Sequence, residues 1–323
     1  MGEQPAGRGR RAGIIVAQTW QTARHAGRSL RRGIGPRLGQ TLRRLGRSAA
    51  SRAFVRVTGK VLVTGSILDQ YVRAAPSPQH VLDIFAGEWA SRLPAPLDTL
   101  RAGTVPLFED ARITWGAEQF GGFAGKTVLE LGPLEGAHTA MLARLGAASI
   151  TAIEANTRAY LKCLIVKELL DLQGAHFLCG DFVEYLRTNR QRFDVAVANG
   201  VLYHMPNPVE VLALLARATD RLLLWTVYYD EEILARSPHI ARRFAGSAPA
   251  EHDGFRYTRH RYEYREALIV EGFCGGAHPF SHWLSRDDIL GALRHFGLSD
   301  IAINFDHPDH PSGPAFALVA QRP

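Results

Sequence analysis

The second half of the chain alternates short apolar runs with longer amphipathic segments. From Lys126 onward, mainly apolar runs are followed by segments whose apolar residues recur every three or four positions. Short apolar runs predict buried strands, and the longer spacing predicts helices packed on a sheet. The expected strands are residues 127–131, 149–153, 176–179, 193–198, 221–228, 301–305 and 315–320. The expected helices are residues 137–145, 157–172, 182–189, 209–218 and 286–296.

This alternation predicts an α/β fold with a Rossmann-like, doubly wound sheet of seven strands. The last two expected strands follow each other without an intervening helix, so we expect an antiparallel terminal hairpin. Residues 229–282 break the alternation after the fifth strand and are rich in His, Arg, Tyr and Phe. Long insertions at the carboxyl edge of such a sheet commonly line the substrate site. We therefore expect residues 229–282 to form a substrate-side cap.

The beginning of the chain follows neither pattern. Residues 1–52 are rich in Gly, Arg and Ser without a sustained apolar stripe, which predicts a disordered arm. Residues 53–110 show helical spacing, and a short amphipathic helix is expected over 81–91 after the turn signal at 76–78. We expect 53–110 to form a helical N-terminal extension that packs on a main domain at 111–323.

The net charge of +7 is unevenly distributed. Residues 1–60 hold thirteen arginines and one lysine against a single acid, Glu3, so the remainder is net acidic. A basic arm of this kind can bind nucleic acid or an anionic membrane surface, and the plainer alternative is a solvated tail. Arg10-Arg11 resembles a twin-arginine signal, but the apolar run after it is too short. No run approaches the roughly 18 apolar residues of a membrane span, so no transmembrane segment is expected.

Cysteine and histidine usage indicates neither a disulfide framework nor a metal site. The three cysteines (Cys163, Cys179 and Cys274) are scattered and lack CxxC spacing, which favours a reducing, cytoplasmic location. Six histidines of the insertion and of the stretch 307–310 match no tight ligand spacing and lie among Pro and Gly, so turns and surface explain them better. They are His252, His260, His278, His282, His307 and His310.

A glycine turn follows the first expected strand. Residues 128–136 read Val-Leu-Glu-Leu-Gly-Pro-Leu-Glu-Gly, so the strand runs into a turn with Gly132 and Gly136 and then opens a helix. Glycine lets the backbone turn sharply and approach a ligand closely. Glu154 ends the second strand, where a carboxylate can accept hydrogen bonds from both hydroxyls of a ribose.

Polar residues also end the third and fourth strands. Asp181 and Phe182 follow the third strand, where a carboxylate can accept an adenine amino proton and a ring can cover the base. Asn199 and Gly200 end the fourth strand. Four such elements in order are a much stronger signal than a glycine turn alone.

With these residues in this order, the sequence resembles the class I methyltransferases that use S-adenosylmethionine (SAM), over about residues 110–320. The resemblance implies SAM as cofactor. It implies that Glu154 holds the ribose and that Asn199 and Gly200 lie beside the sulfonium and the methyl group. The methionine end falls to Glu130, Gly132 and Gly136, and the adenine falls to Asp181 and Phe182.

One position departs from this pattern, because Leu134 stands where the family usually has a middle glycine. An NAD-binding Rossmann domain is the alternative, but it would need a third glycine that the turn lacks.

The segment 199–206, Asn-Gly-Val-Leu-Tyr-His-Met-Pro, leaves the fourth strand where an acceptor would approach. Methyl transfer requires an aligned nucleophile and, in many cases, removal of its proton. His204 is a candidate general base, with a turn-fixing histidine as the alternative. Tyr203 is a second candidate catalytic residue, or one that lines the cofactor.

The same segment is also similar to the tRNA wobble-uridine carboxymethyltransferase family, which uses a carboxylated SAM. This resemblance implies cofactor contacts for Tyr203 and for Trp115, for which packing is the alternative. The basic residues that bind the extra carboxylate have no match, and residues 310–315 contain no arginine. Ordinary SAM is therefore the expected donor.

Three functions remain open from the sequence. The first is methylation of an oxygen or nitrogen on a small molecule or glycan, favoured by the complete cofactor pattern and the large insertion. The second is RNA modification through the Arg-rich arm and the aromatic, basic stretch 255–265. The third is a non-catalytic SAM-fold protein tethered by its arm. No pattern indicates an oligomeric state.

Overall fold

The computed structural model describes residues 67–270 and 272–323. The chain divides into two units, residues 1–80 and 81–323. The predictions for the basic arm, and for the extension up to residue 66, lie outside the described residues. Before residue 81 the structure describes the 3-10 helix η1 (Ile67–Gln70) and the start of α4 (Pro78–Asp83).

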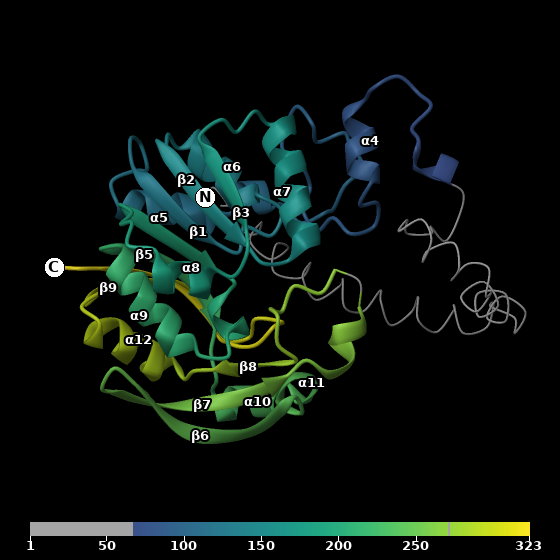
Figure 1. The fold of residues 1–323 in the computed structure, drawn as a ribbon. Coiled ribbons are helices and arrows are strands. Elements are labelled where there is room, and N and C mark those ends of the chain that lie inside the picture. The colour runs from purple at the N-terminus through teal and green to yellow at the C-terminus, as the bar shows by residue number, and fades with distance from the viewer. Residues whose placement is uncertain (1–66, 271) are drawn as a thin grey trace, which may run out of the picture. The chain divides into compact units, whose positions relative to one another are not determined.

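The second unit is built on a seven-stranded sheet with the order β3-β2-β1-β4-β5-β10-β9 (Figure 1). Its first five strands pair in parallel, and β10 is antiparallel to both β5 and β9. This arrangement confirms the predicted doubly wound sheet with an antiparallel terminal hairpin. The strands are β1 (Thr127–Leu131), β2 (Ser149–Glu154), β3 (Ala175–Cys179), β4 (Val195–Asn199), β5 (Arg221–Val227), β9 (Asp300–His307) and β10 (Ala315–Gln321).

Helices cover both faces of this sheet (Figure 1). On one face lie α5 (Ala111–Gln119), α6 (Ala137–Arg144) and α7 (Thr157–Leu169), and on the other α8 (Phe182–Thr188), α9 (Pro208–Ala218) and α12 (Arg286–His295). The central strands are apolar at successive positions because alternate side chains enter opposite cores. Val195 and Val197 of β4 face the α5 side, whereas Ala196 and Ala198 face α9.

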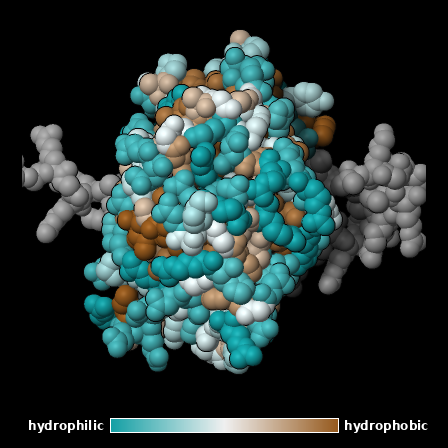
Figure 2. Space-filling view, turned by 90° about the vertical axis from the view of Figure 1, so that its left-hand side faces the viewer, coloured by the Kyte–Doolittle hydropathy of each residue, from teal (hydrophilic) through white to brown (hydrophobic). Residues whose placement is uncertain are grey.

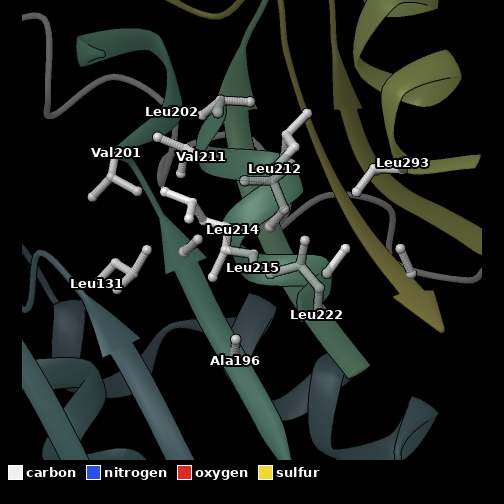
Figure 3. Close-up of a cluster of buried hydrophobic side chains, with 14 of the residues drawn as sticks. Leu131, Ala196, Val201, Leu202, Val211, Leu212, Leu214, Leu215, Leu222 and Leu293 are labelled. Atoms are coloured by element: carbon white, nitrogen blue, oxygen red, sulfur yellow. The ribbon is translucent and has the colours of Figure 1, made fainter. Parts of the chain in front are cut away.

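Helix α9 is buried along nearly its whole length because it lies between the sheet and α12 (Figure 3). Leu212 and Leu215 pack in one cluster with Leu222 of β5 and Leu293 of α12, all fully buried. Each such leucine contributes roughly 1.5–3 kcal/mol through burial. The cluster fixes the end of β4, from which the segment 199–206 emerges.

The insertion after β5 forms a separate antiparallel sheet, which confirms the predicted insertion, while its place on the substrate side stays a prediction. It begins with the short helices α10 (Glu231–Ala235) and α11 (Pro238–Ala241). Its strands are β6 (Phe244–His252), β7 (Phe255–Glu263) and β8 (Phe280–Trp283), with the 3-10 helix η4 (Arg265–Ile269) after β7. Asp253 and Gly254 join β6 to β7 with φ angles of 47° and 81°, as a two-residue hairpin turn requires.

The N-terminal extension is less helical than expected. The predicted helix over 81–91 ends at Asp83, and the next helical turn is η2 (Leu107–Glu109). Gly87 takes a left-handed φ of 86°, and the Trp89 indole donates a hydrogen bond back to the Leu82 carbonyl at 2.9 Å. The chain therefore folds back on α4 instead of continuing it.

Figure 2 shows a face of the protein that is mainly hydrophilic, with apolar residues in small groups. Among the helices of residues 67–270 and 272–323, none combines the length and apolarity that crossing a membrane would need.

Candidate functional site

The glycine turn after β1 contains three left-handed residues, Gly132, Leu134 and Gly136, with φ of 63°, 56° and 76°. A Cβ on Gly132 would lie 2.5 Å from Cγ1 of Val201, so a glycine is required here by both φ and space. Leu134 holds the position of the family's usual glycine in a conformation that costs a non-glycine residue about 1 kcal/mol. Although leucine replaces the usual glycine at position 134, the backbone there keeps the left-handed conformation.

Glu154, at the end of β2, fixes the shape of this turn. Its Oε2 accepts a hydrogen bond from the Leu134 amide at 3.0 Å, and its Oε1 accepts one from the Asn156 amide at 2.8 Å. The side chain is 8% exposed, and burial raises the pKa of its carboxyl group. Each oxygen keeps an acceptor site for a further donor, such as a ribose hydroxyl.

Glu130 lies one residue before the end of β1 and is buried. Its Oε2 accepts a hydrogen bond from Thr139 Oγ1 of α6 at 2.5 Å, and burial raises the pKa of its carboxyl group. The sequence prediction placed Glu130 at the methionine end of the cofactor but did not identify Thr139 as its partner.

A second polar group from α5 and α6 was missed entirely. Asp110 caps α5 and accepts hydrogen bonds from Arg112 and from His138 Nε2, the latter at 2.8 Å. Burial alone would raise the pKa of Asp110, but the His138 and Arg112 hydrogen bonds outweigh it and hold that pKa well below its usual range. The Arg112 guanidinium lies 4.6 Å from the ring centre of Trp225 on β5. In the sequence, only the position of Asp110 as a helix-capping residue before α5 could have indicated this polar group.

Asp181 and Phe182 begin α8, next to the end of β2. The Gly180 amide donates to the Glu154 carbonyl at 3.0 Å, so Asp181 and Glu154 lie at neighbouring strand ends, on the same edge of the sheet. Asp181 is exposed, and its Oδ1 caps α8 through the Val183 amide at 2.7 Å. The Phe182 ring is 6% exposed and packs in the core with α9, so little of it is free to cover a base.

Asn199, the last residue of β4, carries the clearest mark of a binding site. Both polar atoms of its side chain are buried without a hydrogen-bond partner. An unsatisfied buried amide costs roughly 1–3 kcal/mol, so such a group in a protein calls for a specific reason. A ligand that hydrogen-bonds the amide at this strand end would supply it. The following Gly200 has a φ of 86° and turns the chain away from β4.

Tyr203 and His204 lie in the 3-10 helix η3 (Leu202–His204), directly after this strand end. Burial raises the pKa of Tyr203 and lowers the pKa of His204 to about 4, yet both side chains are partly solvent-accessible. The Tyr203 ring packs edge-on against Trp225 and Trp283, with ring centres 6.0 and 6.2 Å apart, so an aromatic cluster lies beside the end of β4.

Trp115 lies in helix α5, which packs on one face of the sheet. Its half-buried ring packs edge-on against Phe305 of β9, with ring centres 6.0 Å apart. Strand β9 is the edge opposite β3. The contact that the structure shows for Trp115 is thus with β9 rather than with the glycine turn, which favours packing.

The cap contributes residues that the sequence patterns did not reveal. The Asn156 side-chain amide, just beyond Glu154, donates to the Phe273 carbonyl at 3.2 Å. A Cβ on Gly276 would lie 3.3 Å from the His204 carbonyl oxygen. The cap segment 273–276 therefore runs from the end of β2 to η3.

The histidine-rich stretches do not assemble into a metal centre. Over the parts of the chain that the structure describes, no three His, Cys, Asp or Glu side chains are grouped so that they could hold a metal ion.

Comparison with known proteins finds the following similarities. Residues 123–236 match the family model of a methyltransferase domain. A search of curated proteins finds no match. The N-terminal domain of EvdMO1 with SAH bound is 22% identical, with a TM-score of 0.59, over 76% of this chain and 95% of that one. The same domain with SAH and D-fucose has a TM-score of 0.58 at the same identity and coverage. Magnesium protoporphyrin IX methyltransferase from Synechocystis PCC 6803 with SAH is 18% identical, with a TM-score of 0.45, over 66% of this chain and 81% of that one.

Residues 123–236 thus match a methyltransferase domain. The sheet that contains them has the α/β fold of the EvdMO1 N-terminal domain.

Proposed function

We propose that this protein transfers a methyl group from SAM to an oxygen or nitrogen of a small molecule or glycan. The observation that carries the proposal is the unsatisfied Asn199 amide at the end of β4, between the glycine turn and the aromatic cluster of Tyr203, Trp225 and Trp283. When bound, SAM supplies a methyl carbon activated by its positive sulfur. Gly132, Gly136 and Glu130 would hold its methionine end, and Glu154 its ribose.

The aromatic cluster at this strand end supports a small molecule or glycan as acceptor. Tyr203 and Trp225 are partly exposed, Trp283 is buried behind them, and the Arg112 guanidinium lies over the Trp225 ring. Aromatic rings with a few polar groups are typical of pockets for sugars and small organic molecules. Modification of RNA through the Arg-rich arm is the second candidate, supported by the charge of residues 1–60. It requires tRNA binding that weakens steeply with salt. A cytoplasmic location agrees with the absence of a cysteine framework and stays a prediction.

Cofactor binding tests the proposal through Glu154. In Glu154→Gln an amide group replaces one acceptor oxygen and faces a backbone N–H, which disturbs both the turn and a ribose hydroxyl. We expect the dissociation constant for SAH to rise about tenfold, as measured by calorimetry. Glu184→Gln, on the exposed side of α8, is the matched control and should bind like the wild type. Equal SAH affinity in all three proteins would remove Glu154 from the site, and no SAH binding by the wild type would end the proposal.

In this mechanism His204 accepts the proton that the acceptor loses. Because burial lowers its pKa to about 4, the imidazole is neutral, and thus able to take a proton, at every pH above about 5.

The pH dependence of turnover follows from this pKa. We expect kcat/KM to be flat from about pH 6 to 8 and to fall as pH drops through about 4, where His204 becomes protonated. The half-buried His310, whose pKa burial also lowers to about 4, is the control: His310→Gln should keep the acid limb and His204→Gln should lose it. Activity regained on return to pH 7 checks that the fold is kept. An acid limb that survives in His204→Gln would assign the proton to another group.

A further inference from the structure

Tyr264 of the cap makes the one side-chain hydrogen bond that the structure describes for His204. Its hydroxyl oxygen lies 2.8 Å from His204 Nδ1, although the two residues are sixty positions apart. Tyr264 follows β7 directly, and the sequence analysis included it only as part of the aromatic, basic stretch 255–265. The contact with His204 is present without a ligand.

The Tyr264 ring is held firmly. It is 5% exposed and packs edge-on against Phe273, with ring centres 5.0 Å apart. A Cβ on Gly275 would lie 2.8 Å from Tyr264 Cε1, so the cap backbone closes on the ring. A phenol fixed in this way can hold the imidazole of His204 in one orientation.

The hydrogen bond also bears on which nitrogen of His204 carries a proton. A neutral imidazole has one N–H and one free lone pair, on different nitrogens. If Nδ1–H donates to the phenol oxygen, the lone pair is on Nε2, which is then free to accept a proton. When Nε2 accepts it, the Nδ1–H bond to Tyr264 persists in the imidazolium, so the ring need not reorient.

We propose that Tyr264 is a positioning residue, whose phenol oxygen accepts the Nδ1 proton of His204 and so leaves Nε2 to take the proton of the acceptor. The inference rests on the proposed function for the role of His204. It adds that the cap insertion completes the proton-accepting group, besides lining the acceptor site.

Few charged groups face the pair. Tyr203 lies on the same turn as His204 and is itself near Arg112 of α5. Ser281, Tyr262 and Cys274 of the cap lie near Tyr264. Burial is the cause that lowers the pKa of His204, and burial likewise raises that of Tyr264. Both groups are therefore neutral at pH 7, which the donor and acceptor roles require.

The state of the His204 ring can be measured without knowing the acceptor. In the full chain labelled with ¹⁵N-histidine, long-range ¹H–¹⁵N NMR distinguishes the two neutral tautomers, and His204→Gln identifies the signal. We expect the wild type to show the Nδ1–H form at pH 7 and Tyr264→Phe to shift toward the Nε2–H form. Tyr262→Phe is the matched control, because its ring stacks on Trp283 at 5.0 Å and should leave the tautomer unchanged.

Turnover gives the second readout. With an acceptor found from labelled SAM and cell extract, Tyr264→Phe should lower kcat about tenfold, a part of the roughly 10²–10⁴-fold that a general base contributes, with the SAH dissociation constant unchanged. The acid limb of the pH profile should move to lower pH, because the phenol no longer stabilises the imidazolium. Tyr262→Phe should retain both kcat and the limb.

The outcomes separate the two proposals. A wild-type His204 in the Nε2–H form would overturn the positioning role, and this result does not depend on whether Tyr264→Phe folds. A tautomer unchanged in folded Tyr264→Phe would overturn it as well. Full turnover in His204→Gln would instead contradict the base in the proposed function, while the tautomer data would still decide what Tyr264 does.

Discussion

Replacing Lys162 with methionine is expected to lower the free energy of unfolding by about 3–5 kcal/mol, the cost of leaving a buried charge unpaired. Lys162 Nζ lies 2.6 Å from Oε1 of Glu135, and the two side chains are 6% and 1% exposed. Lys162 also donates to the Glu88 carbonyl at 2.9 Å. Methionine fills a similar volume but leaves the Glu135 carboxylate in the core without its cation.

Urea denaturation of the variant and of a matched control measures this effect. Lys167→Met makes the same change on the same helix, where the lysine donates to the Ala175 carbonyl and is less buried. We expect Lys167→Met to cost about 1 kcal/mol, the value of an ordinary hydrogen bond. Equal losses of unfolding free energy in the two variants would show that the Lys162–Glu135 ion pair does not stabilise the fold more than an ordinary hydrogen bond.

Replacing Gly132 with alanine should impair both stability and cofactor binding. The left-handed φ of 63° costs an alanine about 1–2 kcal/mol, and its Cβ would meet Val201 Cγ1 at 2.5 Å. Val201 is buried and β-branched, so it has few rotamers with which to yield. Because Val201 immediately precedes η3, its displacement should also move Tyr203 and His204.

Gly121→Ala separates these two causes. Gly121 has a φ of 66°, and a Cβ there would meet nothing within 4 Å. It should therefore show the backbone cost alone, about 1–2 kcal/mol, and bind SAH normally. Gly132→Ala should lose more stability and bind SAH at least about tenfold more weakly by calorimetry, which corresponds to about 1.4 kcal/mol. Identical behaviour of the two variants would contradict a role for the Gly132–Val201 contact.

The spacing of apolar residues along the sequence was enough to predict most of the fold. The alternation after Lys126 predicted all seven strands of the main sheet, because each buried strand is a local apolar run with its own turn signals. The strand-end residues were also visible, since a parallel sheet brings the carboxyl ends of its strands to one edge. The helix predicted over 81–91 was too long, because a pattern of apolar residues does not show that Gly87 takes a left-handed turn.

The residues that complete the site could not be found in this way. Tyr264 reaches His204 across sixty positions, and Asp110 reaches His138 across twenty-eight. Such pairs depend on how the elements pack and leave no periodic trace in the sequence. Glu135 lies inside the glycine turn that the sequence indicated. Its buried partner Lys162 lies in α7, and nothing in the sequence distinguishes this lysine from a surface one.

The Glu135 carboxylate has one more pair of partners, the backbone amides of Ala90 and Ser91, at 2.9 and 2.8 Å. The glycine turn that would bind the methionine end of SAM is therefore hydrogen-bonded to a segment some forty-five residues upstream. In a shortened protein that starts at residue 111, where the sequence pattern suggested the domain begins, the Glu135 carboxylate would lose these two hydrogen-bond donors and become exposed. We infer that the smallest autonomous unit reaches back at least to Glu88.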